Sequence, residues 1–200
     1  EPRLAHLPRP YVTVLVGGSS GPYVFDEIAA ARLGREASAL ARRLGGSVLV
    51  STSARTNPNA VNALFAAVDA PSYLHRWAPG AEQNPYLGFL GLADRLIVTG
   101  DSISMIAEAV ATGRPVEMFD FGSGSVPMRR DGFAASEGSS VLDRVRGWVY
   151  ERYMRFPPGR LNRSRDLRVV HRALLAAGKV SWLGEPAPAP TMRLVGDELT

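Results

Sequence analysis

Short β-branched segments alternate with helical segments through roughly the first 120 residues of the chain, a pattern that favours an α/β fold. Residues 12–16 (VTVLV) and 95–99 (RLIVT) are the clearest strands, since continuous apolar runs are typical of parallel strands buried on both faces. Further strands are expected at 47–51, 73–77 and 115–119, and helices between Asp26 and Gly45 and at 59–68, 84–93 and 103–112. The alternation predicts a Rossmann-like, doubly wound parallel sheet.

Local capping signals support these helix boundaries. Asp26 precedes the first helix and can cap it, and Gly45 with Gly46 can end it. Gly113 is expected to close the helix at 103–112. The first helix therefore has a predicted start and a predicted end.

The C-terminal third has a different character. Residues 120–138 are rich in glycine and serine and predict a mobile surface loop, followed by helices at 141–153 and 165–177. Proline and alanine alternate at the start of 185–200, so an extended Pro-rich tail is expected there. The predicted nucleotide-binding domain is thus 1–184.

Composition excludes several chemistries. The chain has no cysteine, which rules out a disulfide framework, a thiolate metal site and a cysteine nucleophile. Lys179 is the single lysine, so no P-loop lysine or Schiff base is available. The three histidines are scattered without ligand spacing, and we expect no bound metal.

Sequence features also bear on location. No apolar run approaches the roughly 18 residues of a membrane span, and the N-terminus has no signal-peptide pattern. We therefore expect a cytoplasmic protein. Because the chain lacks an initiator methionine, we also expect a fragment or a processed domain.

Polar or glycine-rich loops follow four of the predicted strands, and ligands of open parallel sheets bind outside the carboxyl ends of strands. After 95–99 come Asp101, Ser102 and Ser104, where backbone N–H groups and the positive end of a helix dipole suit a phosphate. Glu108 lies one helical turn beyond Ser104 and could accept hydrogen bonds from vicinal ribose hydroxyls. The alternative is a capped helix with a solvated glutamate.

Two other loops could contribute to an anion site. Gly17, Gly18 and Ser19 follow 12–16 and would let the backbone approach an oxyanion closely, although a tight turn alone would also use glycine. Their spacing matches neither a dinucleotide fingerprint nor a Walker A loop. Arg55 follows the next strand, where its guanidinium could clamp a diphosphate; the alternative is an exposed arginine.

Two further segments have weaker signals. Glu82, Asn84 and Pro85 lie where a nucleobase edge could be read, or they form a capping loop with proline at a helix start. Residues 152–172 are rich in arginine and could meet an anionic membrane, but a solvated basic helix face is favoured. We expect no nucleic-acid partner.

Residues 99–116 (TGDSISMIAEAVATGRPV) resemble the donor-binding segment of GT-B glycosyltransferases, in which E-A-x-x-x-G-x-P-V closes a strand–loop–helix unit. Together with 16–20 (VGGSS), 53–56 (SART) and 82–86 (EQNPY), this segment is similar to a bacterial and plant family of glycosyltransferases related to the plant mitochondrial fission protein of the elongate-mitochondria type. Residues 166–183 fit the C-terminal end of that family. Ala54 stands where the family would have a second arginine.

The resemblance implies the C-terminal, donor-binding domain of a metal-independent glycosyltransferase, with the N-terminal acceptor domain outside this chain. Its ligand would be a nucleoside-diphosphate sugar, a substrate and not a cofactor, and the isolated domain is expected to be inactive. The implied binding residues are Gly17, Gly18, Ser19, Ser53, Arg55, Glu82, Asn84, Pro85, Asp101, Ser102, Ser104, Met105 and Glu108. The alternatives are a sugar-nucleotide epimerase and a non-catalytic scaffold of the fission-protein type, which binds a nucleotide or lies peripherally on the inner membrane.

Overall fold

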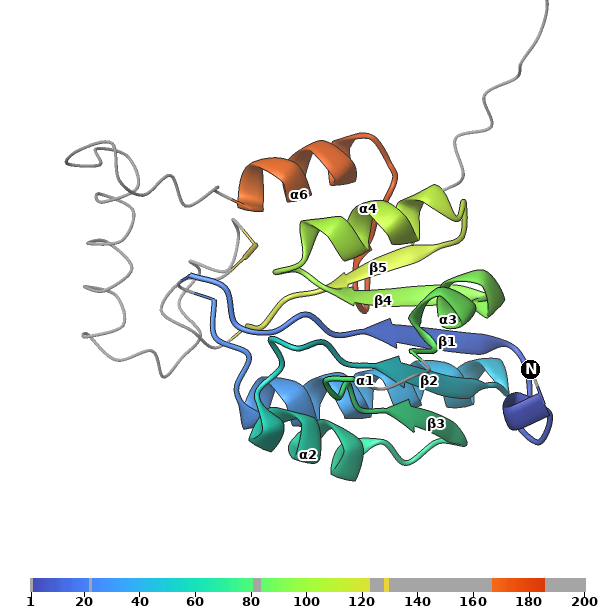
Figure 1. Cartoon of the computed structure of the whole chain (residues 1–200). Helices are drawn as coiled ribbons and strands as arrows, with labels where there is room; N and C mark the ends of the chain where they lie inside the picture. The colour runs from blue at the N-terminus through green and yellow to red at the C-terminus, as the bar shows by residue number, and fades with distance from the viewer. Residues whose placement is uncertain (1, 22, 81–83, 123–127, 130–166, 186–200) are drawn as a thin grey trace, which may run out of the picture.

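Six parallel strands form one sheet in the computed structural model, which describes residues 2–21, 23–80, 84–122, 128–129 and 167–185 (Figure 1). The strand order is β3-β2-β1-β4-β5-β6. The strands are β1 (Tyr11–Leu15), β2 (Ser47–Ser51), β3 (Ser72–His75), β4 (Arg95–Thr99), β5 (Val116–Phe119) and β6 (Ser181–Trp182). The predicted Rossmann-like, doubly wound α/β arrangement is confirmed.

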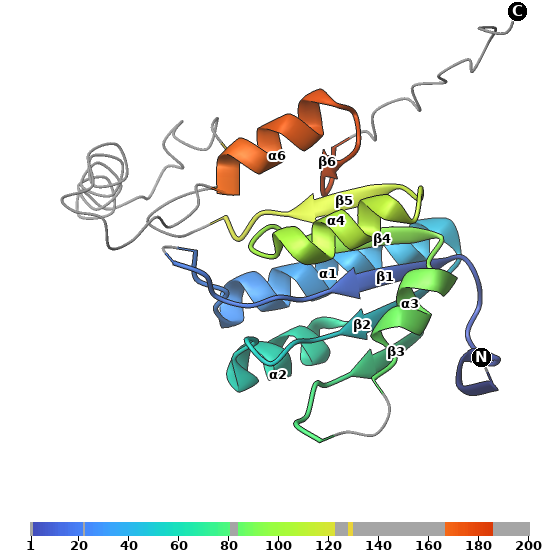
Figure 2. The same cartoon turned by 45° about the horizontal axis from the view of Figure 1, so that its top comes forward.

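Helices cover both faces of the sheet. They are α1 (Glu27–Leu44), α2 (Pro58–Ala67), α3 (Tyr86–Leu92), α4 (Ile103–Ala111) and α6 (Leu167–Ala176), with a short 3-10 helix at Pro2–Leu4. Helices α1 and α2 lie on one face and α3 and α4 on the other, with α6 beside α4 (Figures 1 and 2). Right-handed crossovers require this, because the chain moves from β1 to β3 in one direction and from β4 to β5 in the other.

The central strands are mostly apolar because both of their faces are buried. Every residue of β1 and β2 is buried, since helices pack on both sides of the sheet. Leu33 and Ala37 of α1 are fully buried against this sheet. Gly34 lets α1 and α2 approach closely, because a Cβ there would lie 2.7 Å from the carbonyl oxygen of Leu64.

The predicted ends of α1 are confirmed. The Asp26 carboxylate accepts a 2.8 Å hydrogen bond from the amide of Ala29, which caps the first turn. Gly45 follows the last turn with a left-handed φ of 70°, a conformation that favours glycine. Gly113, with φ of 71°, lies just beyond the last turn of α4.

The sequence did not predict β6, whose two residues pair in parallel with Glu117 and Met118. A strand this short has no periodicity of its own and is recognised only by its partner. The helix predicted at 165–177 is confirmed as α6. The helix predicted at 141–153, the tail beyond Glu185 and most of the loop predicted at 120–138 lie outside the described residues. None of the helices in the described part of the chain combines the length and apolar character needed to span a bilayer.

Candidate functional site

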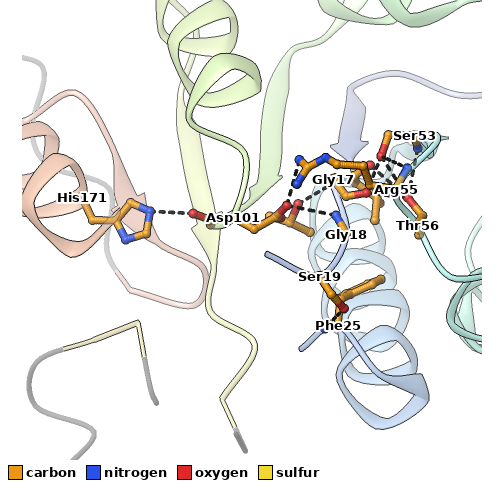
Figure 3. Close-up of polar contacts among 12 residues, drawn as sticks. Gly17, Gly18, Ser19, Phe25, Ser53, Arg55, Thr56, Asp101 and His171 are labelled. Atoms are coloured by element: carbon orange, nitrogen blue, oxygen red, sulfur yellow. Dashed lines mark hydrogen bonds and ion pairs between the residues drawn. The ribbon is translucent and has the colours of Figure 1, made fainter. Parts of the chain in front are cut away.

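The loops after β1, β2 and β4 meet at the carboxyl ends of three adjacent strands (Figure 3). Strands β1 and β4 are neighbours, yet the chain leaves them towards opposite faces of the sheet. This is the topological switch point, where open α/β sheets bind their ligands.

Gly17 and Gly18 permit a very close approach between these loops. The Gly17 amide donates a 2.8 Å hydrogen bond to the hydroxyl of Thr99, the last residue of β4. A Cβ on Gly17 would lie less than 3.0 Å from the Asp101 carboxylate, and one on Gly18 less than 3.0 Å from the Arg55 carbonyl oxygen. Neighbouring atoms leave no room for a side chain at either position. Both therefore require glycine for a reason other than the formation of a tight turn.

Asp101, one of the predicted binding residues, contacts two others, Gly18 and Arg55. Its side chain is 0% exposed, and Oδ2 accepts a 3.0 Å hydrogen bond from the amide of Gly18. The same oxygen lies 3.1 Å from Nη2 of Arg55, whose side chain is 48% exposed. Oδ1 is buried and has no hydrogen-bond partner among the described residues.

Burial controls the acidity of this carboxyl group. Burial raises the pKa of Asp101 to about 6, and the Thr99 hydroxyl, the Arg55 guanidinium and the Gly18 amide act in the opposite direction. Desolvation of the carboxylate therefore outweighs the stabilisation by its three polar neighbours. A perturbed acid at a switch point is a recognised mark of a functional site.

Ser53 and Thr56 fix the orientation of the Gly17–Gly18 peptide. The Ser53 hydroxyl donates to the Gly17 carbonyl oxygen, and the Thr56 hydroxyl donates to the same oxygen at 2.7 Å. Because a trans peptide points its C=O and N–H in opposite directions, these bonds direct the Gly18 amide towards Asp101. The Ser53 hydroxyl thus bonds within the protein, and its predicted contact with the ligand stays a prediction.

The other predicted binding residues of these loops differ in exposure and in their contacts. Ser19 is exposed, and its hydroxyl accepts a 3.0 Å hydrogen bond from the amide of Phe25. Ser102 precedes α4 but makes no side-chain capping bond, so the structure does not support the alternative in which the side chain of this loop caps the helix. Ser104 is exposed in the first turn of α4, and Met105 is partly buried and packs against the core.

His171 supports the β4–α4 loop from α6. Its Nε2 lies 2.7 Å from the carbonyl oxygen of Gly100, and the ring is 1% exposed (Figure 3). Its ring packs edge-on to Trp182, with centroids 5.5 Å apart. No local sequence pattern predicts this contact, because the two residues lie 71 positions apart.

Glu108 and Tyr86 form a second group of contacts, between α4 and the start of α3. The Tyr86 hydroxyl donates a 2.5 Å hydrogen bond to Oε2 of Glu108, and burial together with that carboxylate raises the pKa of Tyr86. Glu108 is exposed, so its carboxylate contacts solvent as well as Tyr86, and its contact with a ribose stays a prediction. Asn84 accepts a 3.1 Å bond from the Tyr86 amide, and Pro85 directly precedes α3. Glu82 lies outside the described residues.

Comparison with known proteins gives a consistent family assignment. The family model described as Mitochondrial fission ELM1 matches residues 1–134. The mitochondrial fission protein ELM1 of Arabidopsis thaliana is 38% identical over 71 residues, which cover 36% of this chain. That match covers 16% of the plant protein, so the similarity concerns a minor part of its length. All the binding residues predicted from the sequence lie within the range of the family model, whereas His171 lies beyond it.

Proposed function

The chain belongs to the mitochondrial fission ELM1 family, and we propose that the loops after β1, β2 and β4 bind the diphosphate of a nucleotide sugar. One observation carries this proposal: the Gly18 amide and the Arg55 guanidinium converge on a single carboxylate oxygen, that of Asp101. A backbone N–H and a guanidinium arranged in this way form a receptor for an oxyanion. A diphosphate is the oxyanion that nucleotide sugars carry.

The neighbouring residues supply the other contacts in this proposal. The first turn of α4, with Ser102 and Ser104, offers backbone N–H groups and a positive dipole end. Glu108 would accept hydrogen bonds from the ribose hydroxyls after giving up its bond to Tyr86, and Asn84 would contact the base. Gly17, Ser53 and Thr56 hold the receptor in shape.

In this proposal the domain is the donor-binding half of a metal-independent GT-B glycosyltransferase. The amide of Gly18 and the Arg55 guanidinium would stabilise the negative charge that develops on the departing diphosphate. The general base and the acceptor site would come from outside this chain. The membrane-scaffold alternative depends on residues 152–172, most of which lie outside the described residues, and it stays a prediction.

Calorimetric titration of the 200-residue chain with UDP, GDP, ADP and their sugars tests the proposal. A ligand at 100 times its dissociation constant should stabilise the domain by about 2.7 kcal/mol in a parallel thermal-shift experiment. Arg55→Ala should abolish the effect. The matched control is Arg43→Ala. Arg43 is exposed in the last turn of α1, whereas the candidate site lies near the first turn of that helix. Absence of binding by every nucleotide would overturn the proposal.

A further inference from the structure

The anion receptor already contains an anion. The Asp101 carboxylate uses both donors proposed for the diphosphate, at 3.0 Å from the Gly18 amide and 3.1 Å from the Arg55 guanidinium. We propose that Asp101 competes with the bound ligand for these two donors, so that diphosphate binding is coupled to uptake of a proton by Asp101. This inference rests on the proposed function and adds its regulation by pH.

Electrostatics makes the two anions mutually exclusive. The Asp101 side chain is 0% exposed, so water screens its charge poorly from a phosphate placed at the same donors. Arg55 is 48% exposed and can turn from one anion to the other. If Arg55 moved to the ligand while Asp101 stayed ionised, the buried carboxylate would lose its counter-ion.

A proton on Asp101 removes this conflict. The neutral acid is a weaker acceptor than the carboxylate and can release the Gly18 amide to the ligand, while Oδ1, which has no hydrogen-bond partner among the described residues, carries the O–H. The neutral group no longer repels a phosphate that is bound by the same donors. Since burial raises the pKa of Asp101 to about 6, the proton is available close to neutral pH.

Among the described residues, the groups around this carboxyl group come from the β1–α1 and β2–α2 loops, from β4 and from α6. Arg55 contacts it from the β2–α2 loop, and the β1–α1 loop contributes the backbone of Gly17 and Gly18. Thr99 of β4 is uncharged. From α6, the titratable His171 contacts Gly100, the residue before Asp101. Any pH dependence that His171 causes remains when Asp101 is replaced, so the two groups can be separated.

The test compares the unmodified chain with Asp101→Asn, using inorganic pyrophosphate as the probe between pH 5 and pH 8. The ratio of the two dissociation constants cancels the titration of the probe itself. We expect Asp101→Asn to bind at least tenfold more tightly at pH 8, with the ratio approaching one at pH 5. A ratio that does not change with pH would overturn the inference.

A second measurement needs no variant. Sulfate keeps its charge throughout this pH range, so protons taken up when it binds go to the protein. Calorimetry at pH 7 in two buffers of different ionisation enthalpy should show uptake of close to one proton per sulfate, and no uptake would count against Asp101. If pyrophosphate and nucleotides bind neither form, the proposed function itself fails. If they bind with a constant ratio, only the coupling is wrong.

Discussion

The Thr56 hydroxyl donates a 2.7 Å hydrogen bond to the carbonyl oxygen of Gly17. On the opposite side of the same peptide group, the Gly18 N–H donates to the Asp101 carboxylate. One side chain of the β2–α2 loop thus sets the direction of a donor in the β1–α1 loop. The S-x-R-T segment therefore has two roles: Ser53 and Thr56 orient the peptide, and Arg55 supplies the positive charge.

Thr56→Val removes this hydroxyl with little change in shape. We expect the free energy of unfolding to fall by about 1 kcal/mol, and the affinity for a nucleoside diphosphate to fall several-fold because the Gly18 amide is no longer held. Ser47→Ala is the matched control, since Ser47 donates a 2.7 Å bond to the Pro8 carbonyl at the other end of β2. It should lose stability and keep its affinity. Equal affinities in the two variants would contradict the orienting role.

Gly18→Ala places a methyl group less than 3.0 Å from the Arg55 carbonyl oxygen. The two loops must then separate, so we expect a loss of about 1–3 kcal/mol in stability and loss of nucleotide binding. Gly88→Ala in α3 meets no atom within 4 Å and should stabilise the helix by up to about 1 kcal/mol. Urea denaturation and calorimetry measure both effects. Unchanged binding in Gly18→Ala would remove Gly18 from the site.

Ser102→Ala separates a helix cap from a ligand contact. Ser102 makes no side-chain capping bond, so its replacement should leave the free energy of unfolding nearly unchanged. Asp26→Ala removes a 2.8 Å capping bond and should cost about 1 kcal/mol. Thermal denaturation of the two variants checks the contrast. A lower nucleotide affinity in Ser102→Ala alone would assign its hydroxyl to the ligand.

Glu108→Gln tests the ribose contact. The variant keeps its shape but loses a charged acceptor, so nucleotide affinity should fall by roughly ten- to a hundredfold while stability hardly changes. A 2′-deoxy nucleotide should bind the unmodified chain less tightly than the ribonucleotide does. In the variant the difference between the two affinities should be much smaller. Additive losses in this cycle would mean that the carboxylate and the ribose never meet.

The raised pKa of Asp101 also predicts how stability depends on pH. The folded chain holds this proton up to about pH 6, whereas the unfolded chain releases it near the ordinary value of 3.8. Between these values the folded state binds more protons, so the free energy of unfolding falls as pH rises, by up to about 3 kcal/mol. Urea denaturation at pH 4 and pH 6.5 should show this loss in the unmodified chain. Asp101→Asn should lack it, and equal pH dependence in both would exclude Asp101 as its source.

Much of the fold could be predicted because its signals are local. The buried runs of β1, β2 and β4 follow from their apolar content, and the ends of α1 follow from Asp26 and Gly45. The alternation of these elements then restricts the sheet to a parallel, doubly wound form. The same alternation places the glycines and polar residues at the carboxyl ends of the strands.

The sequence alone therefore determined which elements form and which loops gather at one edge of the sheet. Only the tertiary structure decided the partners: Asp101 pairs with Gly18 and Arg55, and His171 with Gly100. Helix and strand signals repeat within a few residues, whereas these contacts join segments brought together by the crossovers between β1, β2, β4 and α6. Sequence reasoning predicted that Gly18, Arg55 and Asp101 all bind one ligand. In the folded chain their loops pack so that the Gly18 amide and the Arg55 guanidinium both contact the Asp101 carboxylate.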